Sequence, residues 1–166
     1  MKKIACVLAI GLTFSTTGQA NDPGLMSMVM AAAQSNHAVE GLAYNQPATA
    51  VPIAARPCPR VGVVYQESTR HRRGPRIDSF IVCPGQNPET IQDVSPSLPD
   101  DRQFQQLTLM AVRGALRYGE QRADWSGYHV ETRRLSYADP QGCAQVETTV
   151  VSGGLLVSYH VGRMCP

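Results

Sequence analysis

The fold is decided by residues 143–165, which read CAQVETTVVSGGLLVSYHVGRMC. Two runs rich in β-forming residues, 144–151 and 155–161, flank a Gly-Gly pair at 153–154 that is typical of a two-residue hairpin turn. A disulfide bond between the first and last residues of the stretch would close the open end of this hairpin. An ideal turn leaves those two cysteines out of register by one residue, so we expect a β-bulge, a wider turn or a splayed end.

A second hairpin of the same kind is predicted over residues 58–83. Its β-rich runs, 61–65 and 76–82, enclose the polar stretch 68–75, which contains Gly and Pro. Symmetric folding about this stretch places the following residues opposite each other: Val64 and Ile77, Arg60 and Ile81, Cys58 and Cys83. A disulfide bond across the open end follows from that register.

Four cysteines are expected in the mature chain: Cys58, Cys83, Cys143 and Cys165. Their spacing does not match the paired C-x-x-C pattern of zinc sites, and we expect no metal or other cofactor. Four cysteines allow three connectivities, and the two hairpins favour Cys58–Cys83 together with Cys143–Cys165. Under the loop-entropy model, each bond stabilises the fold by about 3 kcal/mol.

The first twenty residues are typical of a secretory signal peptide. Lys2 and Lys3 form the basic start, residues 4–14 form an apolar run, and residues 18–20 (Gly-Gln-Ala) resemble a cleavage site. The alternative is an uncleaved anchor, but the apolar run is short for a hydrocarbon layer of about 30 Å. We therefore expect a periplasmic or secreted protein of bacterial type, with no membrane span after cleavage.

Cleavage changes both the charge and the cysteine count. The two lysines are the only ones among the 15 Lys+Arg, and they leave with the signal, as does Cys6. The remaining arginines balance the 13 Asp+Glu, so the mature chain has no formal net charge. This balance does not support a globally basic nucleic-acid-binding domain.

Upstream of the hairpins, residues 24–40 predict a short helix that starts with Asp22 and Pro23. Its Met-rich sequence fits either an adaptable contact surface or packing on its own domain. Residues 43–57 are rich in Pro and Ala and predict a linker or an extended wrap.

Residues 100–119 predict the main helix, which Asp100 would cap and Gly119 would end. Residues 128–137 predict a further strand. The expected fold class is α+β: an antiparallel sheet of stapled hairpins with one main helix packed on it and a short N-terminal helix. The expected organisation is a signal peptide over 1–20, a helix and linker over 21–57, and a disulfide-stapled domain over 58–166.

A basic cluster lies at the tip of the first hairpin. Its members are Arg70, His71, Arg72, Arg73 and Arg76. Because a disulfide bond would anchor the hairpin's base, the tip could bind a phosphate, a carboxylate or an acidic protein patch through bidentate arginine contacts. The alternative is a solvated loop that aids solubility.

A hydrolytic site is a weaker alternative. His129, Glu147, His160 and Arg163 could imitate the acid, base and phosphate-binding groups of a small secreted ribonuclease. An ideal turn would put His160 opposite Glu147, whereas the register of the disulfide puts His160 opposite Thr148 and turns Glu147 to the other face.

Taken together, these features predict an exported, non-enzymatic protein-interaction module of the bacterial envelope. A secretion or conjugation accessory and an inhibitor or immunity protein are the subclasses considered. The expected partner is a protein, with an anionic ligand possible at the arginine-rich tip. The alternative function is a small phosphodiesterase or ribonuclease-like hydrolase.

Overall fold

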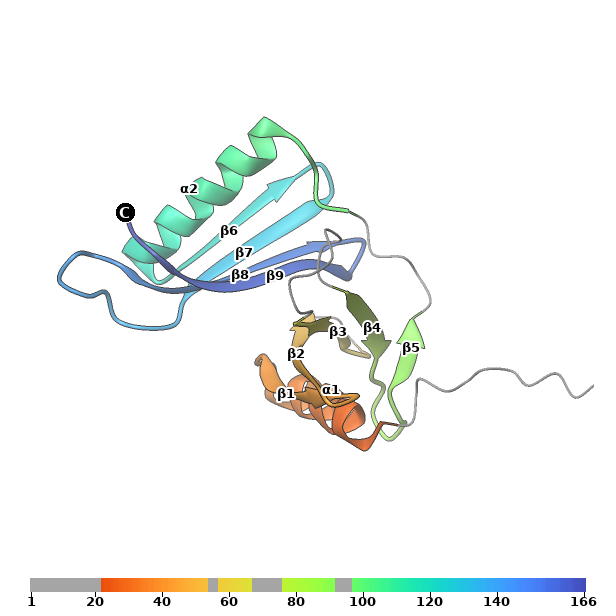
Figure 1. The fold of residues 1–166 in the computed structure, drawn as a ribbon. Coiled ribbons are helices and arrows are strands. Elements are labelled where there is room, and N and C mark those ends of the chain that lie inside the picture. Colours follow the sequence, from red (N-terminus) through yellow and green to blue (C-terminus); the bar gives the residue numbers. More distant parts are fainter. Residues whose placement is uncertain (1–21, 54–56, 67–75, 92–96) are drawn as a thin grey trace, which may run out of the picture.

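The computed structural model describes residues 22–53, 57–66, 76–91 and 97–166. Over these ranges the chain forms two helices and nine strands, arranged as two antiparallel sheets with a helix on each (Figure 1). The α+β class predicted from the sequence is confirmed. The predicted signal peptide lies outside the described residues.

The first sheet has the strand order β1-β2-β3-β4-β5 and carries α1. Its elements are α1 (Pro23–Ser35), β1 (Val39–Ala43), β2 (Gln46–Ile53), β3 (Arg60–Tyr65), β4 (Ile77–Ile81) and β5 (Glu89–Ile91). The carboxylate of Asp22 caps α1 by accepting from the backbone N–H groups of Gly24 and Leu25, and it also accepts from the backbone N–H of Tyr44. The cap therefore ties the start of the helix to the β1–β2 turn. The bond from Tyr44, followed by that from Leu25, lowers the pKa of Asp22.

The first hydrophobic core lies between α1 and this sheet. Leu25, Val29 and Ala32 are fully buried, and they pack with Met28 against side chains of β2, β3 and β4. Met26 and Met30 are partly buried against the same core. Of the two interpretations of the Met-rich helix, packing on its own domain is the one observed.

The second sheet has the strand order β6-β7-β8-β9 and carries α2. Its elements are α2 (Arg102–Tyr118), β6 (Glu120–Trp125), β7 (Tyr128–Arg134), β8 (Ala144–Ser152) and β9 (Leu155–Met164). Asp101, one residue after the predicted cap Asp100, accepts from the backbone N–H groups of Gln103 and Phe104. Gly119, at φ 96°, ends the helix as predicted. The buried face of α2 includes Phe104, Ala111 and Ala115.

The first half of the chain (α1 and its sheet) and the second half (α2 and its sheet) have a similar order of elements. Each begins with an Asp-capped helix, continues with a hairpin on a two-residue turn, and ends with a hairpin whose base is joined by a disulfide bond. The first turns, Tyr44-Asn45 and Ser126-Gly127, place all four residues at positive φ, as the mirror-image hairpin turns require. In this correspondence α1 and β1–β4 match α2 and β6–β9, and β5 is an addition.

The sheets face each other, so the layers run α1, first sheet, second sheet, α2 (Figure 1). Leu156 of β9 is fully buried and packs with Val51, Ile53 and Val64 of the first sheet. It lies over Gly62, where an added Cβ would come within 2.5 Å of the Leu156 Cβ. The close approach of the two sheets therefore requires glycine, which has no side chain, at position 62.

A second contact joins the halves at the β8–β9 turn. Nη1 of Arg60 donates to the carbonyl oxygens of Gly153 and Gly154, at 3.2 and 3.3 Å. Arg60 starts β3, so the first residue of that strand holds the turn of the second stapled hairpin.

Both predicted disulfide bonds, Cys58–Cys83 and Cys143–Cys165, are present. The first hairpin has the predicted register, with Arg60 opposite Ile81 and Val64 opposite Ile77. In the second, His160 lies opposite Thr148, and the pairing shifts at Val150/Val151. This shift is the bulge that the one-residue mismatch between turn and cysteines demands.

The prediction of a linker over residues 43–57 is wrong for residues 46–53, which form β2 between β1 and β3. Pro47 lies opposite Leu42 of β1, and its carbonyl accepts from the N–H of Gln66, the residue after β3. Pro52 lies opposite Val61 of β3, beyond the residues of β2 that pair with β1. Each proline therefore lies where β2 overhangs one of its neighbours, and only residues 48–50 have a strand on both sides. A proline is tolerated there because a side without a neighbouring strand requires no N–H donor.

The single sheet expected from the sequence is replaced by two. Three further strands, β1, β5 and β6, were also not predicted from the sequence. Because β2 pairs with β1 on one side and with β3 on the other, the first sheet contains strands from both sides of the expected boundary at residue 57.

Two disulfide bonds indicate a protein that folds outside the reducing cytoplasm. Within the described ranges, neither helix combines the length and the apolar character needed to cross a bilayer.

The contact between Gly62 and Leu156 gives the first test. We expect Gly62→Ala to lower the free energy of unfolding by about 1–3 kcal/mol, because the new methyl group overpacks the joint. In a Leu156→Gly background the same substitution should cost much less, since all three nearest atoms, Cβ, Cγ and Cδ2 of Leu156, are gone. Urea unfolding of the four proteins measures this coupling. Equal costs in both backgrounds would contradict this account of the joint.

Candidate functional site

The basic hairpin tip lies largely outside the described residues, which include only Arg76 of the predicted cluster. Arg76 is bound within its own sheet: Nε and Nη2 donate to the two carboxylate oxygens of Asp78, at 3.1 and 2.8 Å. Its guanidinium also lies 4.9 Å from the centre of the Tyr65 ring. Burial, followed by the hydrogen bond to Asp78, raises the pKa of Tyr65. Arg76 thus has a structural role that the sequence did not indicate.

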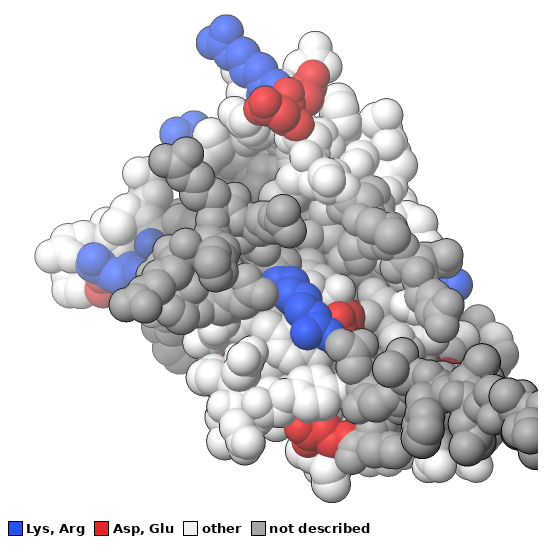
Figure 2. Space-filling model, turned by 45° about the vertical axis from the view of Figure 1, so that its right-hand side comes forward, with Lys and Arg blue, Asp and Glu red and all other residues white. Residues whose placement is uncertain are grey.

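Charges on the described surface are mixed rather than gathered into one field. Figure 2 shows a face on which the described basic and acidic side chains lie in small neighbouring groups. Four arginines of the described residues form ion pairs with carboxylates: Arg76–Asp78, Arg122–Glu131, Arg133–Glu147 and Arg163–Asp139. This mixture agrees with the zero net charge expected for the mature chain.

The four residues of the hydrolase alternative are divided among three places. His129 and Glu147 line one cleft between the sheets. His160 lies opposite Thr148, and so on the other face of the second sheet from Glu147. Arg163 is engaged at the end of that sheet by Asp139. The bulged register therefore puts His160 on the other face from Glu147, and Arg163 is kept apart by its place at the end of the sheet and its pairing with Asp139.

Glu147 and His129 each have another partner. The Glu147 carboxylate accepts from Nε and Nη2 of Arg133 at 3.2 and 2.7 Å, and from the hydroxyl of Tyr159 at 3.0 Å. His129 pairs through Nδ1 with Asp124, and both of these side chains are well exposed. In the part of the chain that the structure describes, no three His, Cys, Asp or Glu side chains are grouped so that they could hold a metal ion.

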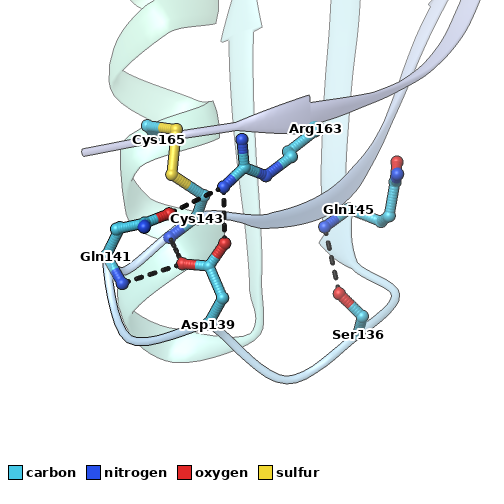
Figure 3. The surroundings of a disulfide bond; sticks show 7 residues. All are labelled: Ser136, Asp139, Gln141, Cys143, Gln145, Arg163 and Cys165. Carbon is cyan, nitrogen blue, oxygen red and sulfur yellow. Dashed lines mark hydrogen bonds and ion pairs between the residues drawn. A yellow bond between two sulfur atoms is a disulfide. The ribbon is translucent and has the colours of Figure 1, made fainter.

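The loop between β7 and β8, beside the second disulfide bond, is held by many hydrogen bonds (Figure 3). Asp139 is its hub: Oδ1 accepts from the backbone N–H groups of Gln141 and Cys143, at 3.0 and 2.9 Å, and Oδ2 accepts from Nη2 of Arg163 at 2.6 Å. The same Nη2 reaches Oε1 of Gln141 at 3.0 Å. The loop is thus fixed both covalently and by charge-assisted hydrogen bonds.

The side of this loop nearer β7 is tied down as well. The hydroxyl of Ser136 accepts from the backbone N–H of Gln145, and the N–H of Leu135 donates to the carbonyl of Gln145. Between these two anchored parts lies Tyr137, whose exposed fraction is 96%. A large aromatic side chain is therefore presented to solvent from a loop that is held at both ends.

Two other large apolar side chains of the adjoining segments are also exposed. Leu135 is 48% exposed and Tyr118, at the end of α2, is 77% exposed. The chain brings them together because the N–H of Arg134 bonds to the carbonyl of Gly119, directly after Tyr118. Next to them, a hollow of about 400 Å³ is lined by Arg113, Leu116, Arg117, Ala138, Gly142 and Pro166. We call Tyr118, Leu135, Tyr137, Arg113 and Arg117 the Tyr137 surface.

This surface is only partly predictable from the sequence. Residues 139–142 (Asp-Pro-Gln-Gly) predicted a turn, and Cys143 predicted a disulfide bond. A tyrosine next to such a turn is the signal that could have identified the loop. The contribution of α2 depends on tertiary structure and has no local signature.

Comparison with known proteins gives no relative: no family model, no curated protein and no solved structure matches this chain.

The hub at Asp139 gives a test by titration. The hydrogen bond from Arg163 and then that from the Cys143 N–H lower the pKa of Asp139 below its ordinary 3.8. The ionised carboxylate of Asp139 therefore stabilises the fold above about pH 4, and this stabilisation is lost as the pH falls through the lowered pKa. We expect the carboxyl carbon of Asp139, followed by NMR, to titrate below 3.8, and Arg163→Gln to move the midpoint upwards. The control Arg122→Gln should leave the titration midpoint of Asp139 unchanged. If Arg163→Gln also leaves this midpoint unchanged, the pairing of Asp139 with Arg163 is ruled out.

Proposed function

We propose that this protein is an exported, non-enzymatic protein-binding module of the bacterial envelope, and that it binds its partner through the Tyr137 surface. The main observation behind this proposal is the exposure of Tyr137, which is 96%. Its loop is held in place by the Cys143–Cys165 bond and the Asp139–Arg163 pair. Tyrosine is a preferred anchor of interfaces, and an anchor already held in one geometry costs less entropy on binding.

The surroundings of the tyrosine indicate the chemistry of the partner. Tyr118 and Leu135 extend the apolar area, and Arg113 and Arg117 lie beside it on α2. Neither arginine has an ion-pair partner among the described residues. A protein surface with an apolar centre and carboxylates at its rim would complement this arrangement.

The envelope assignment rests on two further points. The disulfide bonds fit an oxidising compartment, and the first twenty residues are typical of an export signal. Within this class, a secretion or conjugation accessory and an inhibitor or immunity protein both require such a contact surface. The hydrolase alternative has less support, because only His129 and Glu147 of its four residues share a cleft.

The proposal can be tested with the mature, oxidised protein as bait in a bacterial envelope extract. We expect it to capture a specific protein, and Tyr137→Ala to weaken that binding by about 2 kcal/mol, roughly thirtyfold, as the loss of a hot-spot aromatic does. Arg117→Glu should also weaken it, since charge complementarity is reversed. Biolayer interferometry with the identified partner measures both effects.

The matched control is Leu42→Ser, which removes a comparably exposed apolar side chain (59%) from β1 in the first half. It should bind as the unchanged protein does. If Tyr137→Ala binds normally, or if Leu42→Ser is equally impaired, the Tyr137 surface is not the contact site.

A further inference from the structure

A cleft of about 340 Å³ lies between the two sheets. The sheets touch at Leu156, and the cleft begins beside that contact, at Val51, Ile53 and Val151. It is lined by none of the residues of the Tyr137 surface. Its size is within the range of small-molecule binding sites.

The two walls of the cleft differ in chemistry. One wall belongs to the first half: it is apolar at Ala38, Val51, Pro52 and Ile53, and Asn36 and His37 add polar side chains at its α1 end. The other belongs to β6, β7 and β8 and is polar: Arg122, His129, Glu131, Arg133, Glu147 and Thr149. A ligand that fits both walls needs an apolar body and a polar head.

Arg133 is the best-positioned group of the polar wall. Nε and Nη2 both donate to Oε2 of Glu147, which fixes the plane of the guanidinium. Glu147 is itself only 8% exposed, and its other oxygen accepts from Tyr159. Burial and the neighbouring Glu147 charge raise the pKa of Tyr159, so its hydroxyl stays protonated and keeps donating. This chain of contacts holds Arg133 rigidly while its side chain remains 40% exposed.

The polar wall offers a fixed donor whose hydrogen-bonding capacity is not fully used within the described part of the chain. Among the described residues, Nη1 of Arg133 has no hydrogen-bond partner, whereas both oxygens of Glu147 are occupied. Arg122 pairs with Glu131 by one bond of 3.2 Å between side chains that are 73% and 52% exposed. A pair so exposed to water contributes little and can exchange partners.

We propose that this cleft binds an organic monocarboxylate with an unbranched aliphatic chain. The carboxylate accepts from Nη1 of Arg133, with Arg122 as a second donor, and the aliphatic chain lies against Val51, Pro52 and Ile53. A monoanion is favoured over a phosphate dianion because Glu131 and Glu147 already compensate the two arginines. An ammonium ligand is disfavoured because the Glu147 carboxylate is already held by Arg133 and Tyr159, and Glu131 is paired with Arg122. This site is additional to the proposed protein-binding function and does not depend on it.

The experiment is an NMR titration of the mature, oxidised protein with acetate, butyrate, hexanoate, hexylammonium and phosphate as separate probes. We expect saturable shifts of cleft amides with hexanoate, and affinity that rises roughly threefold or more for every two methylene groups from acetate to hexanoate, because the apolar wall covers them. Hexylammonium and phosphate should leave these amides unmoved.

Variants locate the carboxylate. Arg133→Gln should weaken hexanoate binding at least about tenfold, by loss of a charge-assisted hydrogen bond, whereas Arg102→Gln, on α2 and outside the cleft lining, should not. The chain-length series uses the unchanged protein, so it decides the matter even if Arg133→Gln fails to fold. Absence of saturable shifts with hexanoate, equal binding of hexylammonium, or binding of phosphate alone would overturn the proposal.

Discussion

The distance between the two sheets is set by the contact of Leu156 with the bare backbone of Gly62. Each half has its own core beneath its own helix, so neither core fixes how the halves sit together. The inner faces carry few apolar side chains, and these gather where Leu156 meets the first sheet. Any side chain at position 62 would push the sheets apart, and the width of the cleft beside this contact would change with it.

Much of the fold is predictable because its pairings are local. The cysteines and turns of the two stapled hairpins fix register within short stretches, so both bonds, both registers and the bulge follow from residue spacing. β2 is not predictable in this way. Its prolines suggest a linker, and they are acceptable only because β1 and β3 overlap it unequally, which is a tertiary fact.

The candidate sites are less predictable than the fold, since each joins distant segments. Tyr137 becomes part of a surface only when Arg134 bonds to Gly119 and brings the end of α2 beside the loop. The cleft joins the end of α1 and β2 to the second sheet, so the sequence could not associate Arg133 with Ile53. The separation of Glu147 from His160, by contrast, follows from the bulge and was foreseeable from the cysteine spacing.

The placing of each disulfide bond within one half has a consequence for the order of oxidation. The bonded cysteines are only 25 and 22 residues apart. If the chain leaves the cytoplasm N-terminus first, Cys58 and Cys83 reach the oxidising side before Cys143 does. They can pair while no competing thiol is present, and the second half then has only one choice left. Because each half contains its own disulfide bond, the chain can avoid the reshuffling of incorrectly paired cysteines, a step that takes seconds to hours and often needs an isomerase.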